Sequence, residues 1–167
     1  MLLDWRKRIL PVDPLVERIK KLERRDVAFD IGAGTGYFTV HLAKLFKKVY
    51  AVEKDFERAK EISKKGLKNV GVIVTDKPPD IDFEVDFVLF ADSLHEIEDK
   101  EGYAEWVEKH AKAFAVIDWK KEACQNFGPP IGKRLDLDYV VGLFKGFRVE
   151  VINVYECHFF VFGYVLR

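Results

Sequence analysis

The sequence has few cysteines and no long hydrophobic segment. Its two cysteines, Cys124 and Cys157, lie far apart and form no C-x-x-C pair, so we expect neither a disulfide framework nor a cysteine-rich metal site. The most apolar stretch, residues 158–166, is about half of the ~20 residues that a membrane-spanning helix needs. Charge appears at once after the first residues, from Asp4, which does not fit a secretory signal. We therefore expect a cytoplasmic protein with no membrane partner.

An excess of charge of either sign is also absent, because 28 Lys and Arg residues balance 28 Asp and Glu residues. Dedicated nucleic-acid binders usually carry a strong basic excess, so we do not expect nucleic acid as a partner. Amides are scarce as well: Gln occurs once and Asn three times, whereas charged residues make up 34% of the chain. Replacement of thermolabile amides by charged residues is typical of hyperthermophile proteins and predicts a thermophile source.

The 167 residues, 49% of them hydrophobic, are enough for one domain with a sizeable core. Apolar runs of strand length alternate with amphipathic helical stretches, which favours an α/β sheet. The connector at 77–80 is too short and too rich in proline for a full helix. The predicted strands cover 27–31, 49–52, 70–74, 85–90 and 113–117. The predicted helices cover 14–22, a stretch holding Phe38, Leu42, Leu45 and Phe46, then 56–65, 100–110, and a last helix with Asp136 as its N-cap.

Two further strands, 147–154 and 158–166, are separated by only three residues. A parallel crossover needs about ten residues or more, so these strands must form an antiparallel hairpin. The sequence thus predicts one Rossmann-like domain over residues 1–167, with residues 1–25 as an N-terminal helical cover. We expect a seven-stranded, mostly parallel sheet that ends in an antiparallel hairpin and carries helices on both faces.

A glycine-rich loop, Gly32-Ala33-Gly34-Thr35-Gly36, follows the first predicted strand and precedes a helix. Glycines at such a junction allow a tight turn and let a ligand approach the backbone. The acid Asp30 stands two residues before the first glycine. Tyr37 occupies the position where the dinucleotide fingerprint G-x-G-x-x-G requires glycine, so the loop differs from a nicotinamide site.

Two more acids stand at the ends of neighbouring strands. Glu53 ends the second strand, where a carboxylate can accept hydrogen bonds from both hydroxyls of a ribose. Asp76 follows the third strand and can meet the exocyclic amine of an adenine. With Asp30 they define one crevice of ligand size at the carboxyl edge of the sheet.

Together these segments resemble class I S-adenosylmethionine-dependent methyltransferases. Residues 27–39 look like the first motif of that family, and Glu53, Asp76 and residues 86–90 match its later motifs in order and spacing. The antiparallel terminal hairpin is the family's topological mark. Residues 94–99 are similar to the small-molecule branch, which includes ubiquinone- and menaquinone-biosynthesis methyltransferases. The resemblance implies an enzyme with S-adenosylmethionine as cofactor and a small molecule as methyl acceptor.

The resemblance also implies a cofactor role for each matching position. Asp30 and the glycine loop would hold the methionine part, Glu53 the ribose, and the residues after the second and third strands the adenine side. Residues just past the fourth strand would lie near the sulfonium. The full set is Asp30, Gly32, Ala33, Gly34, Gly36, Tyr37, Phe38, Glu53, Lys54, Asp76, Lys77, Ala91, Asp92 and Ser93. The family's Gly-Gly turn before the fifth strand is replaced by residues 109–112.

Methyl transfer from a sulfonium needs orientation of the reactants and a base only when the acceptor atom carries a proton. His95 and Glu96, after the fourth strand, are the best-placed candidates for that base. The alternative is that they cap or orient the loop before the next helix. Trp119 ends the fifth strand and either forms a pocket wall or covers hydrophobic residues.

Three other polar residues carry weaker signals. Lys133 and Arg134 either steer an anionic substrate or lie on the surface, the commoner place for basic residues. His158 stands beside Cys157, but two ligands do not make a metal site, so we predict no bound metal.

Other functions remain open. The first alternative is RNA, DNA or protein as the acceptor, although the Asn/Asp-Pro-Pro-aromatic motif of amino-methylating DNA enzymes is replaced here by Ala91-Asp92-Ser93-Leu94. A cofactor-binding partner subunit without turnover is a second alternative. A nicotinamide oxidoreductase is disfavoured by Tyr37 and by the terminal hairpin. The sequence leaves the identity of the acceptor and the oligomeric state undetermined.

Overall fold

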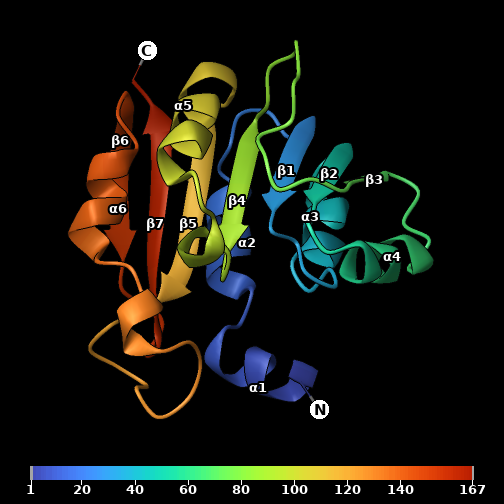
Figure 1. Ribbon diagram of the computed structural model, residues 1–167. Helices are drawn as coiled ribbons and strands as arrows, with labels where there is room; N and C mark the ends of the chain where they lie inside the picture. Colours follow the sequence, from blue (N-terminus) through green and yellow to red (C-terminus); the bar gives the residue numbers. More distant parts are fainter. Residues whose placement is uncertain (1, 167) are drawn as a thin grey trace.

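The protein is described by a computed structural model that covers residues 2–166, and its sheet forms the centre of the molecule (Figure 1). Seven strands pair in the order β3-β2-β1-β4-β5-β7-β6. They are β1 (Val27–Ile31), β2 (Lys48–Val52), β3 (Val70–Ile73), β4 (Phe87–Ala91), β5 (Ala113–Trp119), β6 (Phe147–Ile152) and β7 (His158–Val165).

Helices cover both faces of this sheet, as predicted. They are α1 (Leu2–Ile9), α2 (Asp13–Ile19), α3 (Thr39–Leu45), α4 (Phe56–Lys64), α5 (Lys100–His110) and α6 (Leu137–Leu143), with short 3₁₀ turns η1 (Leu94–Glu96) and η2 (Ile131–Lys133). Leu15 of α2 and Leu42 of α3 belong to one buried cluster. Trp106 of α5 and Val140 of α6 belong to another, on the opposite face. Each face of the sheet therefore has its own hydrophobic core.

One strand of the sheet, β7, runs in the opposite direction to the others. Strands β1 to β5 pair in parallel, whereas β7 runs antiparallel to both β5 and β6. This arrangement confirms the predicted Rossmann-like sheet with an antiparallel C-terminal hairpin. Strand order reverses between β1 and β4, and in such sheets a crevice opens there, beyond the carboxyl ends of the strands. The topology thus brings the segments after β1, β2 and β4 to one edge.

The structure differs from the sequence prediction mainly at the N-terminus. Within the predicted N-terminal helical cover, a separate helix α1 precedes the helix predicted at 14–22, and α2 ends at Ile19 instead of residue 22. The turn between these helices is fixed, because the Tyr155 hydroxyl donates a hydrogen bond to the carbonyl of Pro11 (2.7 Å). Leu10 is fully buried in the same region. These contacts hold α1 near the carboxyl edge of the sheet, where Figure 1 shows it.

Two connections agree with the sequence prediction. No helix lies between β3 and β4; instead the Trp106 Nε1–H donates to the carbonyl of Pro79 (2.7 Å) and holds the connector on α5. Asp136 is the N-cap residue of α6, although its side chain makes no capping hydrogen bond and instead pairs with Lys121 (3.2 Å). Within residues 2–166, no helix is long and apolar enough to cross a membrane.

Candidate functional site

The glycine loop forms the floor of the site. Gly32, Gly34 and Gly36 all adopt positive φ (70°, 61° and 97°), a conformation that side chains rarely tolerate. A Cβ atom at Gly32 would lie against the side chain of Ser93, whose hydroxyl donates to the carbonyl of Ile31 (2.7 Å). A Cβ atom at Gly34 would meet nothing within 4 Å. The loop therefore packs against the end of β4 at one glycine and is open to a ligand at another.

Asp30, at the end of β1, is a buried carboxylate with a perturbed pKa. Its side chain accepts a hydrogen bond from the Thr39 hydroxyl (2.7 Å), and the residue is 2% exposed. Burial raises the pKa of Asp30 to about 6, and the charge of Glu53 adds to the rise, whereas Thr39 and Arg6 oppose it. Perturbed carboxylates of this kind gather at functional sites.

Glu53 follows β2 and organises the loop as well as facing the crevice. One carboxylate oxygen accepts the backbone N–H of Gly34 (2.8 Å), and the other accepts the N–H of Asp55 (2.9 Å). The residue is 4% exposed. Each carboxylate oxygen can accept more than one hydrogen bond, so Glu53 keeps acceptor capacity for hydroxyl groups. Asp76 and Lys77 lie further out, on the exposed segment after β3.

One cavity of about 1510 Å³ unites these residues. All fourteen residues that the sequence assigned to the cofactor line its wall, and so does Glu96. His95 is not part of that wall. The cavity also includes residues that sequence reasoning missed, above all Trp5, Arg6 and Lys7 of α1.

Arg6 brings a positive charge over the glycine loop. Its guanidinium lies 5.4 Å from the ring centre of Tyr37 and 3.8 Å from the carboxylate of Asp92. The side chain is 29% exposed, so the cation is partly removed from water. In the sequence, Arg6 belongs to a short basic run that looks like a solvated surface, and only the position of α1 shows its role.

Two aspartate–histidine pairs hold the segment after β4. Asp92, which adopts a positive φ of 53°, pairs through Oδ1 with Nε2 of His158 on β7 (2.8 Å). His95, on η1, pairs through Nδ1 with Oδ1 of Asp118 on β5 (2.8 Å). The strained backbone at Asp92 is thus fixed from two neighbouring strands. Strain held in this way is common where a chain lines a functional site.

The pair formed by His95 and Asp118 lies directly behind Glu96. Nε2 of His95 lies 3.5 Å from Oε1 of Glu96, and the Glu96 side chain is 55% exposed on the cavity wall. Burial lowers the pKa of His95, but the hydrogen bond and charge of Asp118, with the charges of Glu96 and Asp92, outweigh burial and raise that pKa above its usual value. Of the two residues predicted as base candidates, only Glu96 faces the cavity, and His95 lies behind it.

Trp119, at the end of β5, proves to be a hydrophobic cover and not part of the cavity wall. Its ring packs against His158 (4.4 Å between ring centres) and against Trp5 (6.0 Å), and Trp5 in turn lines the cavity. Trp119 is 4% exposed. The residue therefore supports the cavity from behind.

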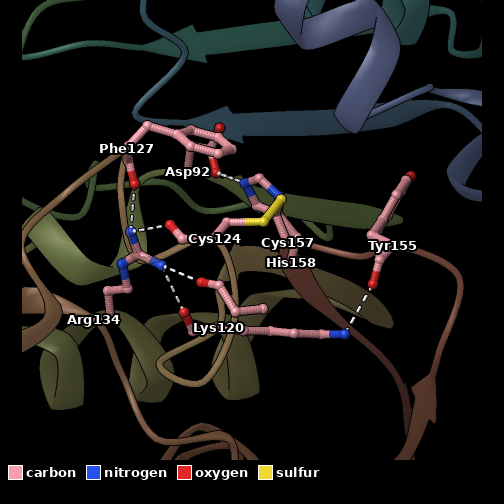
Figure 2. Close-up of a disulfide and its surroundings, with 9 residues drawn as sticks. Asp92, Lys120, Cys124, Phe127, Arg134, Tyr155, Cys157 and His158 are labelled. Atoms are coloured by element: carbon pink, nitrogen blue, oxygen red, sulfur yellow. Dashed lines mark hydrogen bonds and ion pairs between the residues drawn. A yellow bond between two sulfur atoms is a disulfide. The ribbon is translucent and has the colours of Figure 1, made fainter.

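Arg134 organises the loop that connects β5 to α6. It is 3% exposed, and its five N–H groups donate to five backbone carbonyls of that loop. Figure 2 shows the contacts with Lys120, Cys124 and Phe127. The guanidinium also lies 5.1 Å from the ring centre of Trp119. Arg134 therefore neither steers a substrate nor lies on the surface, the two alternatives that the sequence left open, because all of its N–H donors are used within the fold. The carbonyls belong to Lys120, Ala123, Cys124, Phe127 and Pro129.

The sequence predicted no disulfide framework, yet the two cysteines form one disulfide. Cys124, in the loop around Arg134, is joined to Cys157, the residue before β7 (Figure 2). Their Cα atoms lie 5.5 Å apart. The pairing of β5 with β7 places Trp119 opposite His158, and so brings the two cysteines together despite a separation of 33 residues. In the described part of the chain no three His, Cys, Asp or Glu residues gather to hold a metal.

Comparisons with known proteins bear on the family and the fold of the chain. The family model described as ribosomal RNA adenine dimethylase matches residues 13–93, which run from α2 to just after β4. A SAM-dependent methyltransferase from Aquifex aeolicus is 29% identical, with a TM-score of 0.81 over 96% of this chain and 93% of that one. A type 11 methyltransferase from Sulfolobus solfataricus is 28% identical, with a TM-score of 0.80 over 94% and 92%.

An rRNA methylase from Streptococcus thermophilus shares the fold at 18% identity, with a TM-score of 0.71 over 94% of this chain and 97% of that one. No curated protein sequence is similar enough to count as a relative. The mixed sheet, the glycine loop and the two full-length similarities above 25% identity all indicate the same family. The chain is a class I S-adenosylmethionine-dependent methyltransferase.

Proposed function

We propose that this enzyme methylates a small molecule, which binds between α1 and the segment after β4. The cavity supports this proposal most directly. Its volume of about 1510 Å³ exceeds the roughly 300–1,000 Å³ of an ordinary ligand pocket, so it has room for a cofactor and a second small molecule. Helix α1 covers one side of it, which favours an enclosed acceptor over a surface-bound one.

The residues present fit S-adenosylmethionine. Space opens above Gly34, where the protein itself places no atom within 4 Å of an added Cβ. Asp30 and Arg6 would bind the charged groups of the methionine part, and Glu53 the ribose hydroxyls. Lys54, Asp76 and Lys77 would meet the adenine side, while residues 91–93 would lie near the sulfonium.

When bound, the cofactor supplies a methyl group already activated by a positively charged sulfur. The protein's contribution is to align the acceptor with that methyl group and to exclude water. Glu96 is the proposed group that faces an acceptor proton, with His95 behind it. Such a base contributes only where the acceptor is an O–H or N–H group.

RNA is the second candidate acceptor, because the matched family model describes ribosomal RNA adenine dimethylases. That match ends at Ser93, however, so it covers the strands that face the cofactor and omits η1, α5 and β5 on the acceptor side. Six Lys and Arg side chains and seven carboxylates line the cavity. This balance does not favour a polyanionic substrate.

The direct test is the release of S-adenosylhomocysteine from S-adenosylmethionine with candidate acceptors. We expect release with members of a small-molecule panel that carry phenol, enol, carboxyl or amine groups. We expect none with ribosomal RNA fragments or unfolded protein. Turnover confined to RNA would contradict the proposal and would establish the second candidate.

We also infer that the protein works inside cells that grow at high temperature. Disulfides are rare in the cytosol of mesophiles but frequent in intracellular proteins of hyperthermophiles. The disulfide Cys124–Cys157 and the scarcity of amides therefore have one explanation.

A further inference from the structure

Asp118 is a buried carboxylate outside the cavity, at the end of β5. It is 1% exposed and accepts three hydrogen bonds, two of them from one residue. Oδ2 accepts the backbone N–H of His95 (3.0 Å), and Oδ1 accepts Nδ1–H of the same ring (2.8 Å) and the backbone N–H of Trp119 (2.9 Å). Two of these contacts therefore fix the backbone around Asp118, and the third fixes the imidazole ring of His95.

The contact with Nδ1 determines the tautomer of His95. An ionised carboxylate only accepts hydrogen bonds, so Nδ1 must carry the proton and Nε2 is the nitrogen left to accept one. That free nitrogen points toward Glu96, at 3.5 Å from Oε1. The His95 side chain is 6% exposed, whereas that of Glu96 is 55% exposed, so Glu96 stands between the imidazole and the cavity.

We propose that Asp118 is a positioning residue that keeps His95 ready to take up the proton which Glu96 removes from the methyl acceptor. This inference rests on the proposed function. As the new bond from the acceptor atom to the methyl carbon forms and the carbon–sulfur bond breaks, the acceptor's O–H or N–H proton passes to the Glu96 carboxylate. It then moves to Nε2 of His95, and it returns to water through the exposed Glu96 carboxylate once the methylated product has left. The acceptor class that fits is one with an ionisable hydroxyl or amine.

The surrounding charges favour this route. The carboxylates that face the imidazole are Asp118 from β5, Glu96 on η1 itself and Asp92 from the segment after β4. Together they stabilise the imidazolium that forms when the proton arrives. The other aspartate–histidine pair, Asp92–His158, lacks such a neighbour. The side chain of His158 is fully buried, and its Nδ1 has no hydrogen-bond partner. Asp92–His158 therefore has no second group to relay a proton.

The first experiment needs no acceptor. Nuclear magnetic resonance titration of the His95 ring in the cofactor-free protein should show a neutral Nδ1–H tautomer. It should also show a pKa above the ordinary value of about 6.5. Asp118→Asn should lower that pKa by about one unit or more, because a neighbouring charge is lost. A neutral Nε2–H tautomer, or a pKa unaffected by Asp118→Asn, would overturn the inference whatever the acceptor is.

The second experiment uses turnover with an acceptor found by the release assay. Asp118→Asn should reduce kcat about tenfold or more, move the acidic limb of the pH profile to lower pH, and leave the Kd for S-adenosylhomocysteine unchanged. Glu96→Gln, which leaves Asp118 and its contacts in place, should also reduce kcat. Glu101 is an exposed carboxylate on α5, so Glu101→Gln is the matched control and should change neither kcat nor the pH profile. An unmoved pH profile in Asp118→Asn would refute the relay while leaving the methyl transfer itself established.

Discussion

Asp30 carries a negative charge where the fold makes that charge costly. Because its pKa is raised from 3.8 to about 6 by burial, the folded protein binds a proton more tightly than the unfolded chain does. The free energy of unfolding therefore falls as pH rises from about 4 to about 6, and stays low above that range. The charged Asp30 carboxylate therefore lowers the stability of the folded protein at neutral pH, as expected of a residue that is retained for its charge.

Asp30→Asn should reveal this cost. The amide can still accept the hydrogen bond from Thr39 but carries no charge, so at pH 8 the variant should be more stable by about 2–3 kcal/mol. At pH 3.5 the gain should largely disappear, since the wild-type carboxyl is then protonated in the folded protein. Urea unfolding at the two pH values measures this difference. The same variant should bind S-adenosylhomocysteine at least tenfold more weakly, and destabilisation at pH 8 would show that the charge is needed for folding.

Gly34 offers a test with a matched control elsewhere in the chain. Gly34 and Gly66 have similar positive φ angles (61° and 65°), and an added Cβ at either would meet no atom within 4 Å. Gly34→Val and Gly66→Val should therefore lose similar stability from backbone strain, about 1–2 kcal/mol. Only Gly34→Val should abolish binding of S-adenosylhomocysteine in calorimetric titration, because only Gly34 lines the cavity. Equal binding by both variants would mean that the ligand does not approach the loop.

At the scale of elements, α1 is the part of the site that depends most on tertiary structure. Its sequence is short and largely charged, and no local signal distinguishes it from a solvated segment. It stays in place because the turn that follows it is buried and bonded, through Leu10 and Pro11. The helix then presents Arg6 to the cavity, while Arg8 remains exposed.

Arg6→Ala should weaken binding of S-adenosylhomocysteine by about tenfold or more, the usual effect of losing a partly buried charge-assisted hydrogen bond. Arg8→Ala removes the same charge from the outer side of α1 and should leave the Kd unchanged. Isothermal titration at two salt concentrations separates a direct contact from a general effect of net charge. If both variants lost affinity equally, Arg6 would act through the overall field and not as a ligand.

The disulfide fixes the loop that supports the cavity from behind. Linking Cys124 to Cys157 across 33 residues should contribute about 3–4 kcal/mol through restriction of the unfolded chain. The double variant Cys124→Ser/Cys157→Ser should lose about that much stability in chemical unfolding. Dithiothreitol should lower the Tm of the wild type toward that of the variant and leave the variant itself unchanged. A wild-type Tm insensitive to reductant, with reduction verified by thiol titration, would contradict a stabilising disulfide.

The parts of the fold that sequence reasoning predicted are those that local pattern determines. The short apolar runs gave the five parallel strands, and the three residues expected between the last two strands required a hairpin. The glycine loop and Glu53 were placed correctly because a turn after a buried strand has few alternatives. The hydrogen bonds that Glu53 makes to that loop were not predicted, since they depend on backbone geometry.

The features that sequence reasoning missed all depend on contacts between distant segments. The disulfide requires β5 and β7 to be neighbours, which cysteine spacing does not reveal. Arg134 looked like a surface cation because a single arginine in a loop usually is one, yet five carbonyls converge on it. His95 was placed near the correct edge, but its burial behind Glu96 follows from its pairing with Asp118.

For the whole molecule, the distribution of charge decides between the two candidate acceptors. Proteins that bind RNA through its phosphates have basic surfaces, and their affinity falls steeply with salt. This chain has a formal net charge of zero, and carboxylates are at least as numerous as cations in its cavity. We therefore expect no binding to ribosomal RNA fragments tighter than about 1 μM at physiological salt, the strong end of non-specific affinity.

Fluorescence anisotropy with labelled RNA at 50 mM and 200 mM salt tests this expectation. The triple variant Glu57→Lys, Glu61→Lys and Glu101→Lys reverses three exposed charges away from the cavity and serves as a positive control. It should gain RNA affinity that disappears at the higher salt concentration, because each reversal raises the net charge by two. Salt-resistant, submicromolar binding by the wild type would indicate specific contacts, and S-adenosylhomocysteine released with the same RNA would then make RNA the substrate. The opposite result, with release only for small acceptors, follows if the cavity under α1 selects the substrate by enclosing it.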